Sequence, residues 1–551
     1  MTLTTGRAQQ DPGEGARPAA AISHATVVRP PDPDPLGPDP DLDPRGPRSR
    51  GGSRPARPAG NGSEGSEGSE EPFPRRAVHR AGVRVRGRIR ALAATVPARL
   101  RLARTATLVL LAALAVLLLR SGLAADGAWD TAEQAHAPSI TSAAGVDLAL
   151  NDMDAQAANI LLSSGEAGRG RLDEAYTKAT GFYDDARRTV SHELRVLAVA
   201  AEGDPAAEET VDRLTENFAI YQERIGRALE NDARPGGKAD ARSDYQSANQ
   251  LLGDELLPEA EALVRTNDTT YLADYTDARD ALDAEELTLL ALGGLLLLLL
   301  GALQWFLAVR FRRILNPGLV AATLCAVTAL VLAGQALSGT AEQMRVARHD
   351  SYDSVVALSK ARALSYQANA DESHFLLFPS LRSSYESTYL ERSQKLYGVQ
   401  GATLDTYADR LDVTWAAYRG DHSVLRFTGE FRRELDNITF PGEREAAERT
   451  IDAYAVYQHD DRTFRDLVGQ GKEREAVVFC LGWQPDQSNA HFGVWMTELQ
   501  KLTDLNRSSF TSSAAEGRAD LAGLLPAAGA ALLLAALLTV LGLRPRLAEY
   551  R

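Results

Sequence analysis

Four long apolar runs separate polar and charged segments along this chain. They cover residues 106–125, 287–309, 314–337 and 521–543. Each run has about the 20 residues that a helix needs to cross the hydrocarbon core of a bilayer. The pattern therefore predicts four transmembrane helices, with two large polar segments between them, residues 126–286 and 338–520.

Within the polar segments the apolar residues recur at helical spacing. In residues 126–286 one such series alternates steps of four and three: Val146, Leu150, Met153, Ala157 and Ile160. Such a series marks one face of a helix, and glycine and proline clusters mark the turns. The expected fold is an all-α membrane protein. It has four transmembrane helices and two tandem extracytoplasmic up-down four-helix bundles.

The second polar segment resembles a diverged copy of the first. MDAQAANILL (153–162) matches ANADESHFLL (368–377) in pattern and in its distance from the preceding apolar run, and AIYQ (219–222) recurs as AVYQ (455–458). Repetition at this scale indicates internal duplication. We expect two units, each built as span, bundle and span, joined by a short link at residues 310–313.

Arginine-rich flanks predict the orientation in the membrane. They are a basic juxtamembrane segment (75–105), the RFRR sequence at the link, and a short tail (544–551). Segments rich in arginine stay in the cytoplasm, so both termini should be cytoplasmic and both polar segments should lie outside the cell membrane. The segment 75–105 should also bind anionic lipids of the inner leaflet.

The first 74 residues form a further cytoplasmic segment. The stretches PPDPDPLGPDPDLDP and GSEGSEGSEE combine proline, glycine, serine and acid with almost no aromatic residues. A chain of this composition buries too little apolar surface to offset the entropy of ordering. Residues 1–74 are therefore expected to be a disordered tail.

Charge and motifs exclude several classes of function. The net charge of −14 lies mainly in the outer segments, which argues against nucleic acid as a ligand. No phosphate-binding loop, nucleophile motif or zinc motif is present, so we expect no enzyme activity, no cofactor and no metal. Asp371, Glu372 and His374 stand close together, but no second ligand pair follows, and a solvated helix face explains them.

One segment of the second unit, residues 412–443, has no counterpart in the first. It combines aromatic and arginine residues, the composition of interface hot spots. We expect it at the membrane-distal end, as either a docking surface or a structural cap on the bundle. The candidate partner-binding residues are Trp415, Tyr418, Arg426, Phe427, Phe431 and Arg432.

Candidate signal-coupling residues lie at two levels of the chain. Asn267 and Asn506 fall on the apolar seam of the last outer helix in each unit. A buried asparagine fixes the register of a bundle, or it keeps two packings close in energy. Arg310, Arg312 and Arg313 belong to the link at the inner face of the membrane.

Two stretches resemble known sensor proteins. DMDAQAANILLSSG resembles the first helix of the four-helix-bundle sensor domains of bacterial chemoreceptors. The four spans with QANADESHFLL resemble the actinobacterial membrane mediators that act between a glutamate-binding lipoprotein and a soluble protein kinase G. That resemblance implies a solute-binding lipoprotein outside and a serine/threonine kinase inside. It supplies no site residue, and homo-oligomer formation stays open.

The sequence therefore favours a non-enzymatic transmembrane signal mediator. It would relay a solute signal, such as an amino acid, from an outer solute-binding protein to a cytoplasmic kinase. Two alternatives remain, a transport-associated membrane subunit and an envelope scaffold. A neighbouring gene for a binding protein and a kinase favours the mediator, and one for an ATPase favours transport.

Topology gives the first testable prediction. Reporter fusions after Asp130, Arg313, Asp350 and Arg551 should report outside, inside, outside and inside, because the arginine-rich flanks remain in the cytoplasm. Paired alkaline phosphatase and fluorescent protein fusions make the measurement. A cytoplasmic signal after Asp350 would contradict the model of two outer domains.

Overall fold

The computed structural model describes residues 95–165, 170–311 and 315–549. Within these ranges the regular structure is helical, apart from one isolated bridge between Gly398 and Thr428. The predicted tail (1–74), most of the basic segment and two candidate coupling residues, Arg312 and Arg313, lie outside the described residues.

The first unit of the chain contains eight helical elements in sequence. They are α2 (Val96–Asp130), η1 (Thr131–His136), α3 (Ala137–Ser163), α4 (Asp173–Ala200), α5 (Pro205–Ala233), α6 (Lys238–Leu251), η2 (Leu252–Leu256) and α7 (Leu257–Phe311). Both η1 and η2 are π-helical turns set between α-helices without a break in the chain direction. α2 and α5 have proline in their first turn. Backbone N–H groups there have no acceptor within the helix, so proline, which has no N–H, loses no hydrogen bond.

The second unit repeats this order with additions. Its elements are α8 (Pro317–Arg345), η3 (Val346–Tyr352), α9 (Asp353–Leu377), η4 (Pro379–Leu381), α10 (Arg382–Leu396), α11 (Leu404–Gly420), α12 (Glu430–Asp436), α13 (Glu443–Gly469), α14 (Glu473–Leu481) and α15 (Ser488–Ala548). η3 is a third π-helical turn, and η4 is a short 3-10 helix. α11 and α12 have no counterpart in the first unit.

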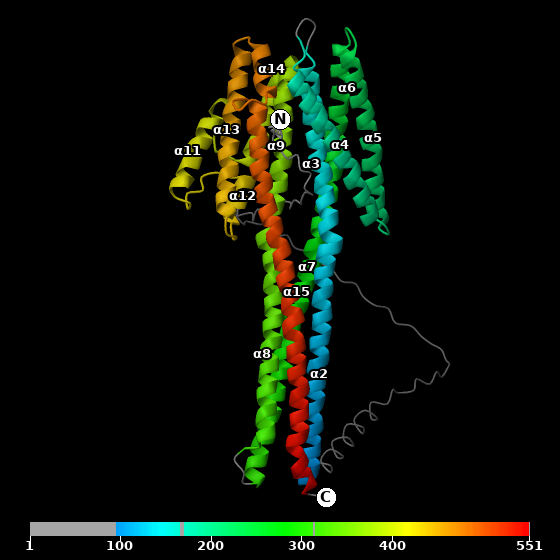
Figure 1. Cartoon of the computed structure of the whole chain (residues 1–551), viewed down its shortest axis with the longest axis vertical. Coiled ribbons are helices and arrows are strands. Elements are labelled where there is room, and N and C mark those ends of the chain that lie inside the picture. The colour runs from blue at the N-terminus through cyan, green and yellow to red at the C-terminus, as the bar shows by residue number, and fades with distance from the viewer. Residues whose placement is uncertain (1–94, 166–169, 312–314, 550–551) are drawn as a thin grey trace, which may run out of the picture.

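Four continuous helices are long and apolar enough to cross a membrane, which confirms the predicted all-α membrane protein. They run over Val96–Ser163, Lys238–Arg310, Pro317–Leu377 and Ser488–Ala548. Figure 1 shows a stem made of α2, α7, α8 and α15, with the remaining helices gathered in a wider head at one end. Each span helix therefore continues directly into the head.

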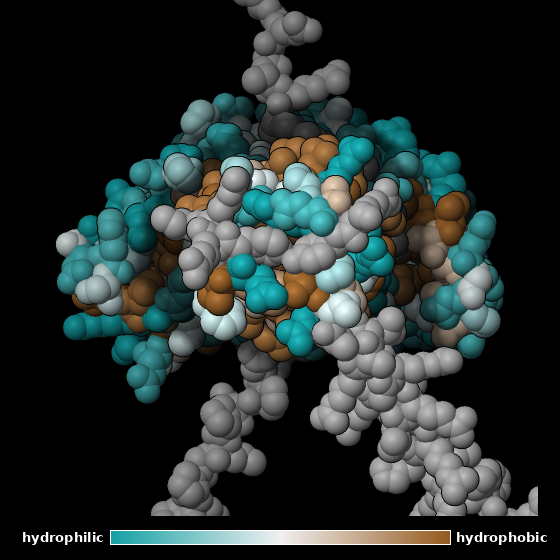
Figure 2. Space-filling model, turned by 90° about the horizontal axis from the view of Figure 1, so that it is seen from below, coloured by the Kyte–Doolittle hydropathy of each residue, from teal (hydrophilic) through white to brown (hydrophobic). Residues whose placement is uncertain are grey.

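Hydrophobic surface follows the stem. Seen from below, Figure 2 shows hydrophobic residues around the stem and hydrophilic residues on the projecting sides of the head. Large apolar side chains such as Leu298, Trp305 and Leu533 are about 70% exposed on the span helices. In water such a surface would be unfavourable, whereas lipid chains solvate it.

The four span helices pack in a ring through small residues. α2 packs against α7 and α15, and α8 packs against the same two helices. Ala326, Ala329 and Ala333 of α8 are buried in this stem. A side chain added at Gly318 would place its Cβ 2.8 Å from Cα of Gly542, so α8 and α15 approach closely at their inner ends.

The part of the first unit that lies in the head, which we call its outer part, contains the predicted helical seam. Val146, Leu150 and Met153 are buried in one core with residues of α4, α5 and α6. α3 packs on α4, and α5 packs on α6. The chain runs out along α3, back along α4, out along α5 and back along α6 and α7, as an up-down arrangement requires.

The outer part of the second unit has a larger aromatic core. α9, α10, α13 and α15 supply its long helices, and α11 and α12 cover one side. Tyr407, Tyr454, Tyr457 and Trp495 are almost completely buried there. Aromatic rings of this size bury much apolar area and account for the compactness of this unit.

The position of α11 and α12 corrects one prediction. Residues 412–443 lie on the half of the head that faces the stem, not at the membrane-distal end (Figure 1). Asn437, at the end of α12, donates hydrogen bonds to the carbonyl oxygens of His349 and Asp350 in η3, at 2.9 and 3.1 Å. The second helix of an up-down unit returns toward the membrane, so its connection to the third helix is membrane-proximal.

The geometry supports the duplication. η1 starts at Thr131 and η3 starts at Val346, and these positions are as far apart in sequence as the matched Met153 and Ala368. Two π-helical turns thus occupy the same place in the two units, directly after the first span. A π-helical turn needs one extra residue per turn and is rare, so this agreement is a strong sign of common origin.

Matched arginines make matched contacts between the units. Arg518 of α15 binds Asp126 of α2, with Nη1 3.2 Å from Oδ1. Arg279 of α7 donates from Nη1 to the carbonyl oxygen of Ala341 in α8 at 2.7 Å. Both arginines lie on the last long helix of their unit, and Asp126 and Ala341 are as far apart in sequence as the matched Met153 and Ala368. The units are therefore related by an approximate two-fold axis along the stem.

Close packing at the top of the stem gives the second prediction. Trp129 is 2% exposed, and a Cβ added at Gly517 would lie 2.7 Å from its Cζ2 atom. Gly517→Leu should lower the free energy of unfolding by about 1–3 kcal/mol through overpacking between α2 and α15. Thermal unfolding of the detergent-solubilised chain, followed by tryptophan fluorescence, measures the change.

Gly523→Leu is the matched control on the same helix. A Cβ at Gly523 meets no heavy atom within 4 Å, so this variant should unfold at the wild-type temperature. Equal destabilisation by the two substitutions would mean that Gly517 does not set the approach of α15 to α2.

Candidate functional site

The boundary between the two outer domains is the candidate functional site, because its two central helices belong to different units. α3 packs against α9. Tyr352, Val356, Leu377 and Phe378 of the second unit belong to the hydrophobic core of the first. The matched stretches that the sequence analysis singled out therefore lie face to face across one interface.

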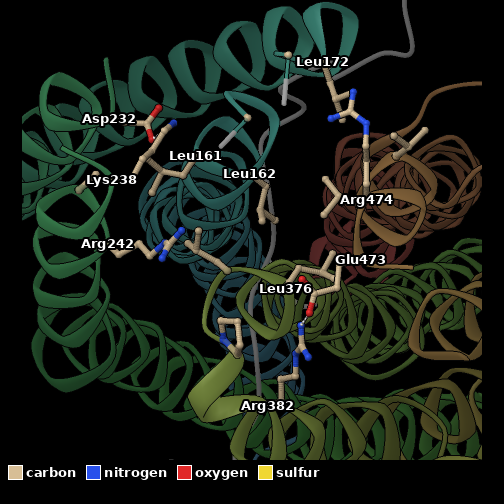
Figure 3. Close-up of a pocket in the computed structure, with 17 residues that line it drawn as sticks. Leu161, Leu162, Leu172, Asp232, Lys238, Arg242, Leu376, Arg382, Glu473 and Arg474 are labelled. Atoms are coloured by element: carbon tan, nitrogen blue, oxygen red, sulfur yellow. Dashed lines mark hydrogen bonds and ion pairs between the residues drawn. The ribbon is translucent and has the colours of Figure 1, made fainter. Parts of the chain in front are cut away.

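A cavity lies at the membrane-distal end of this interface, and we call it the distal cavity. Its volume is about 130 Å³, and it lies among the ends of α3, α6, α9 and α14 (Figure 3). Apolar walls come from both units, through Leu161 and Leu162 on one side and Leu376 and Leu377 on the other. A volume of this size admits a small solute or the tip of a partner side chain.

Charged side chains surround the distal cavity. Lys238 donates from Nζ to Asp232 and to Ser164, both at 2.6 Å. Arg382 binds Glu473 at 3.0 Å through Nη2. Arg242 and Arg474 add two further cations to the lining, as Figure 3 shows. Among the described residues of the lining, four side chains are basic and two are acidic.

A buried polar layer crosses the interface below the distal cavity. The Tyr245 hydroxyl of α6 donates to Oδ1 of Asp154 on α3 at 2.8 Å and lies 2.6 Å from Nε2 of His374 on α9. Asn249 donates to the other Asp154 oxygen at 2.9 Å. Burial lowers the pKa of His374 below its usual value, so the imidazole is neutral at pH 7.

A second polar contact across the interface joins α3 and α9 directly. Ser373 donates from Oγ to Oδ1 of Asn159 at 2.6 Å, and both residues are buried. Asn159 and His374 are equivalent positions of the matched stretches, so both units contribute a polar side chain to the same layer. Buried polar pairs of this kind fix one register, since a shift leaves donors and acceptors unpaired.

The expectation of a solvated face for Asp371, Glu372 and His374 is wrong. All three are at most 3% exposed. Asp371 pairs with Arg392, and Tyr457 donates to Oε2 of Glu372 at 2.6 Å. Burial raises the pKa of Asp371 to about 6 and that of Glu372 well above its usual value. The sequence could not show this burial, because the covering residues come from other helices.

No group of three or more metal-ligating side chains occurs in the part of the chain that the structure describes. The expectation of no metal and no cofactor stays a prediction.

Most of the candidate partner-binding residues are packed inside the second unit. Trp415, Tyr418, Phe427 and Phe431 are buried in its aromatic core. The Trp415 indole donates from Nε1 to Asp452 at 2.7 Å. These contacts match the structural cap, one of the two interpretations of this segment.

The two candidate arginines of that segment differ in their exposure to solvent. Arg432 is half-buried and donates from Nη1 to the carbonyl oxygen of Leu425 at 2.8 Å. Arg426 is exposed, so it is the only one of the six candidates whose side chain faces solvent freely. A docking role for these residues stays a prediction.

Asn506 is completely buried, as its place on the seam indicates. Its Nδ2 donates to Oε1 of Glu434 at 3.3 Å, which ties α15 to α12. Burial, reinforced by the neighbouring Glu443, raises the pKa of Glu434 to about 8. Asn437 of α12 in turn holds η3, so this network of hydrogen bonds reaches the top of the third span.

Asn267 is only half-buried, and the expectation that it occupies the seam is wrong. The buried polar residue of α7 is its neighbour Asp268, 2% exposed. Asp268 accepts a hydrogen bond from the Tyr352 hydroxyl at 3.0 Å and lies 3.5 Å from Nη2 of Arg348. The face of α7 that carries Asp268 packs against η3 of the other unit. The periodicity of α7 alone does not show which of its faces meets that unit.

Arg348 was missed by the sequence analysis. It is completely buried in η3, binds Asp353 at 2.5 Å, and its guanidinium lies 4.5 Å from the ring centroid of Tyr352. A buried arginine in this setting needs its ion pairs and aromatic contacts to offset desolvation. The only sequence signal was its place directly after an apolar run.

The link arginine that the structure describes, Arg310, lies exposed at the inner end of α7. It is accessible to a partner or to lipid headgroups. Its coupling role stays a prediction, as do those of Arg312 and Arg313 outside the described residues.

Comparison with known proteins supports a sensory character for the first outer domain. A family model described as an actinobacterial sensor domain matches residues 128–276. This range covers η1, α3 to α6, η2 and the outer part of α7. No curated protein and no solved structure matches the chain. The resemblance to sensor domains thus has independent support over one outer domain.

The Glu434 network gives the third prediction. With its pKa raised to about 8, Glu434 keeps its proton in the folded chain up to that pH, whereas an unfolded glutamate loses it near the usual pKa of 4.5. The folded state holds the extra proton between these values, so the free energy of unfolding falls as pH rises, by up to about 1.4 kcal/mol per pH unit.

Glu434→Gln should remove the contribution of Glu434 to the pH dependence of the free energy of unfolding. Chemical unfolding of the solubilised wild type and variant at pH 6 and pH 8 measures this contribution: the free energy should fall less between the two pH values in the variant. Glu445→Gln serves as the control, because Glu445 is exposed on the neighbouring helix. If the two variants showed the same pH slope, Glu434 would not be the protonated group.

Proposed function

We propose that the chain is a multi-pass sensor of the cell membrane that relays an outer signal to the cytoplasm without enzyme activity. This proposal rests on the continuity of the span helices. The four span helices run without a break from the stem into the head. Two of them, α2–α3 and α8–α9, pack against each other at the candidate site. A displacement at the distal cavity thus has a rigid path to the membrane.

The sensory side of the proposal rests on the first outer domain. Its similarity to an actinobacterial sensor domain suggests a role in signalling. The distal cavity adds a place where an anionic solute, or an acidic loop of a solute-binding protein, meets residues of both units. A ligand there shifts the balance between two packings only if it binds them unequally.

The cytoplasmic side consists of the inner ends of the four spans. Arg101 near the start of α2 and Arg310 at the end of α7 are exposed. Basic residues at these positions support a cytoplasmic position for both termini and the link, and they would attract anionic lipids. In our proposal a serine/threonine kinase reads the displacement there, and a solute-binding lipoprotein delivers the signal outside.

A reversible lock between α3 and α9 gives the fourth prediction. The side chains of Asn159 and Ser373 touch, so cysteines at these two positions lie close enough for a disulfide after small adjustment. The double variant should form a disulfide under oxidation and lose its response, because the two helices then cannot move against each other. Mass spectrometry of linked peptides confirms the bond.

Phosphopeptide analysis of cytoplasmic proteins, with and without added amino acids, measures the response. Reductant should restore it in the double variant to the level of the single cysteine variants, which also lack the Asn159–Ser373 hydrogen bond but cannot form the cross-link. Removal of the whole chain without any effect on serine/threonine phosphorylation would refute the relay itself. An unchanged response in the oxidised variant would refute movement between α3 and α9.

A further inference from the structure

A second cavity lies where the stem meets the head, and we call it the junction cavity. Its volume is about 310 Å³, within the range of small-molecule sites. Residues at the end of α2, in the turn η1 and in the part of α7 near the head form its walls, and α8 contributes Met344. The junction cavity therefore belongs mainly to the first unit.

The junction cavity begins at the level of the lipid headgroups. Arg120 of α2 and Glu285 of α7 form an ion pair at 2.8 Å, and Glu285 directly precedes the second predicted span. The first lining residue of α2, Ala124, lies one helical turn closer to the head, about 6 Å along the axis. The headgroup layer is about 5–8 Å thick on each side of a bilayer. The cavity is thus within reach both of lipid headgroups and of solutes on the head side of the membrane.

The junction cavity is open because the two units differ at matched positions. Trp129 of α2 and Met344 of α8 are separated by the same number of residues as the matched stretches of the two units. The Trp129 ring packs on Gly517 of α15, where an added Cβ would lie 2.7 Å from Cζ2. Ala278 of α7 corresponds to Gly517, since each directly precedes the arginine that contacts the other unit. Met344 is smaller than tryptophan, so it leaves space beside Ala278 that an indole fills on the other side.

A carboxylate in the junction cavity lacks the partner that its counterpart has. On α15, Glu516 accepts a hydrogen bond from Nε2 of Gln343 at 3.1 Å. The corresponding residues of the first unit are Asp277 and Ala128, which both line the cavity. Alanine has no donor, and Asp277 is exposed and makes no ion pair within the part of the chain that the structure describes. Asp277 therefore offers a negative charge to an occupant.

The rest of the lining suits an organic cation. Trp129, Tyr271 and Tyr275 supply aromatic rings, whose faces attract cations. The described residues of the lining include no lysine or arginine, and the second acid, Asp274, is paired with His136 at 2.7 Å. The structure brings together no set of three metal-ligating side chains among its described residues, so the lining suits an ammonium better than a metal ion.

The nearest cations outside the lining are held by other groups. Arg348 lies 5.6 Å from the ring centroid of Tyr271, and two aspartates balance its charge. Arg279 donates to a carbonyl oxygen of α8 and pairs with Asp283 at 3.7 Å. Neither arginine pairs with Asp277.

We propose that the junction cavity binds an organic ammonium group, with its charge beside Asp277 and its alkyl groups against Trp129 and Tyr275. The ammonium belongs either to the headgroup of an amine-containing phospholipid or to a free amine, two sources that share one chemistry. An occupant touches α2, α7 and α8, so it joins the two units at the top of the stem. This proposal depends neither on the distal cavity nor on the relay to a kinase.

Photolabelling tests the proposal on the full chain in nanodiscs of phosphatidylglycerol and an uncharged glycolipid, two lipids without an ammonium group. The probe is a trifluoromethyl-diazirine derivative of benzyltrimethylammonium, and unlabelled benzyltrimethylammonium is the competitor. Mass spectrometry should locate the label in residues 124–136 and 271–278, and the competitor should reduce it. Label only elsewhere, label that the competitor does not reduce, or no label would overturn the proposal.

Phosphatidylethanolamine distinguishes the two sources of the ammonium. It replaces the uncharged glycolipid, so the share of anionic lipid stays constant. Weaker labelling of the same residues would assign the site to a lipid headgroup. Labelling at the original level would assign it to a free amine. Both results support an ammonium site.

Three single variants test the charge in the cavity. Asp277→Asn should weaken competition about tenfold, the scale of one charge-assisted hydrogen bond. Ala128→Gln should also weaken it, because a glutamine there can bind Asp277 as Gln343 binds Glu516. Asp280→Asn is the control, since it removes an exposed carboxylate of α7 outside the lining and should leave competition unchanged.

A double variant tests the shape of the cavity. Met344→Trp with Ala278→Gly reproduces the pair formed by Trp129 and Gly517, so it should fill the cavity and abolish labelling. Thermal unfolding in the same nanodiscs checks the folding of each variant. If the double variant unfolds, Asp277→Asn still decides the outcome, because Asp277 is exposed. Equal competition in Asp277→Asn and wild type would overturn the proposal.

Discussion

The packing of α3 against α9 is the constraint on which the arrangement of the molecule depends. Each outer domain leaves one face of its first helix uncovered, and the other domain covers it. Tyr352 and Phe378 of the second unit complete the core of the first. The polar pairs Tyr245–His374 and Ser373–Asn159 then select one register, because apolar packing alone tolerates sliding. Separation of the two domains would expose both the core and these polar groups.

Sequence patterns predicted the parts of the fold that depend on local periodicity. The four spans and the seam through Leu150 and Met153 follow from helical spacing and need no knowledge of neighbours. The match between residues 153–162 and 368–377 identified the helices that meet at the candidate site. These features are specified within one helix, so they are visible in the sequence.

The predictions that were wrong concern contacts between units. Asp371 and Glu372 look solvated on an isolated helix, yet residues such as Arg392 and Tyr457 cover them. The seam of α7 suggested Asn267, whereas η3 of the other unit receives Asp268. Aromatic enrichment near Trp415 is equally compatible with a core and with an interface. Burial depends on partners that lie far away in sequence, and periodicity carries no information about them.

Because the two units belong to one chain, they can diverge independently of each other. Each unit crosses the membrane twice, so the copy keeps the orientation of the original and no inversion of topology is needed. A tethered pair also assembles at a fixed effective concentration, independent of how densely the protein populates the membrane. Unlike the identical subunits of a symmetric dimer, the two halves accumulate substitutions separately. α11 and α12 occur only in the second unit. Fusion of two copies thus allows the two sides of an approximately symmetric molecule to specialise for different neighbours.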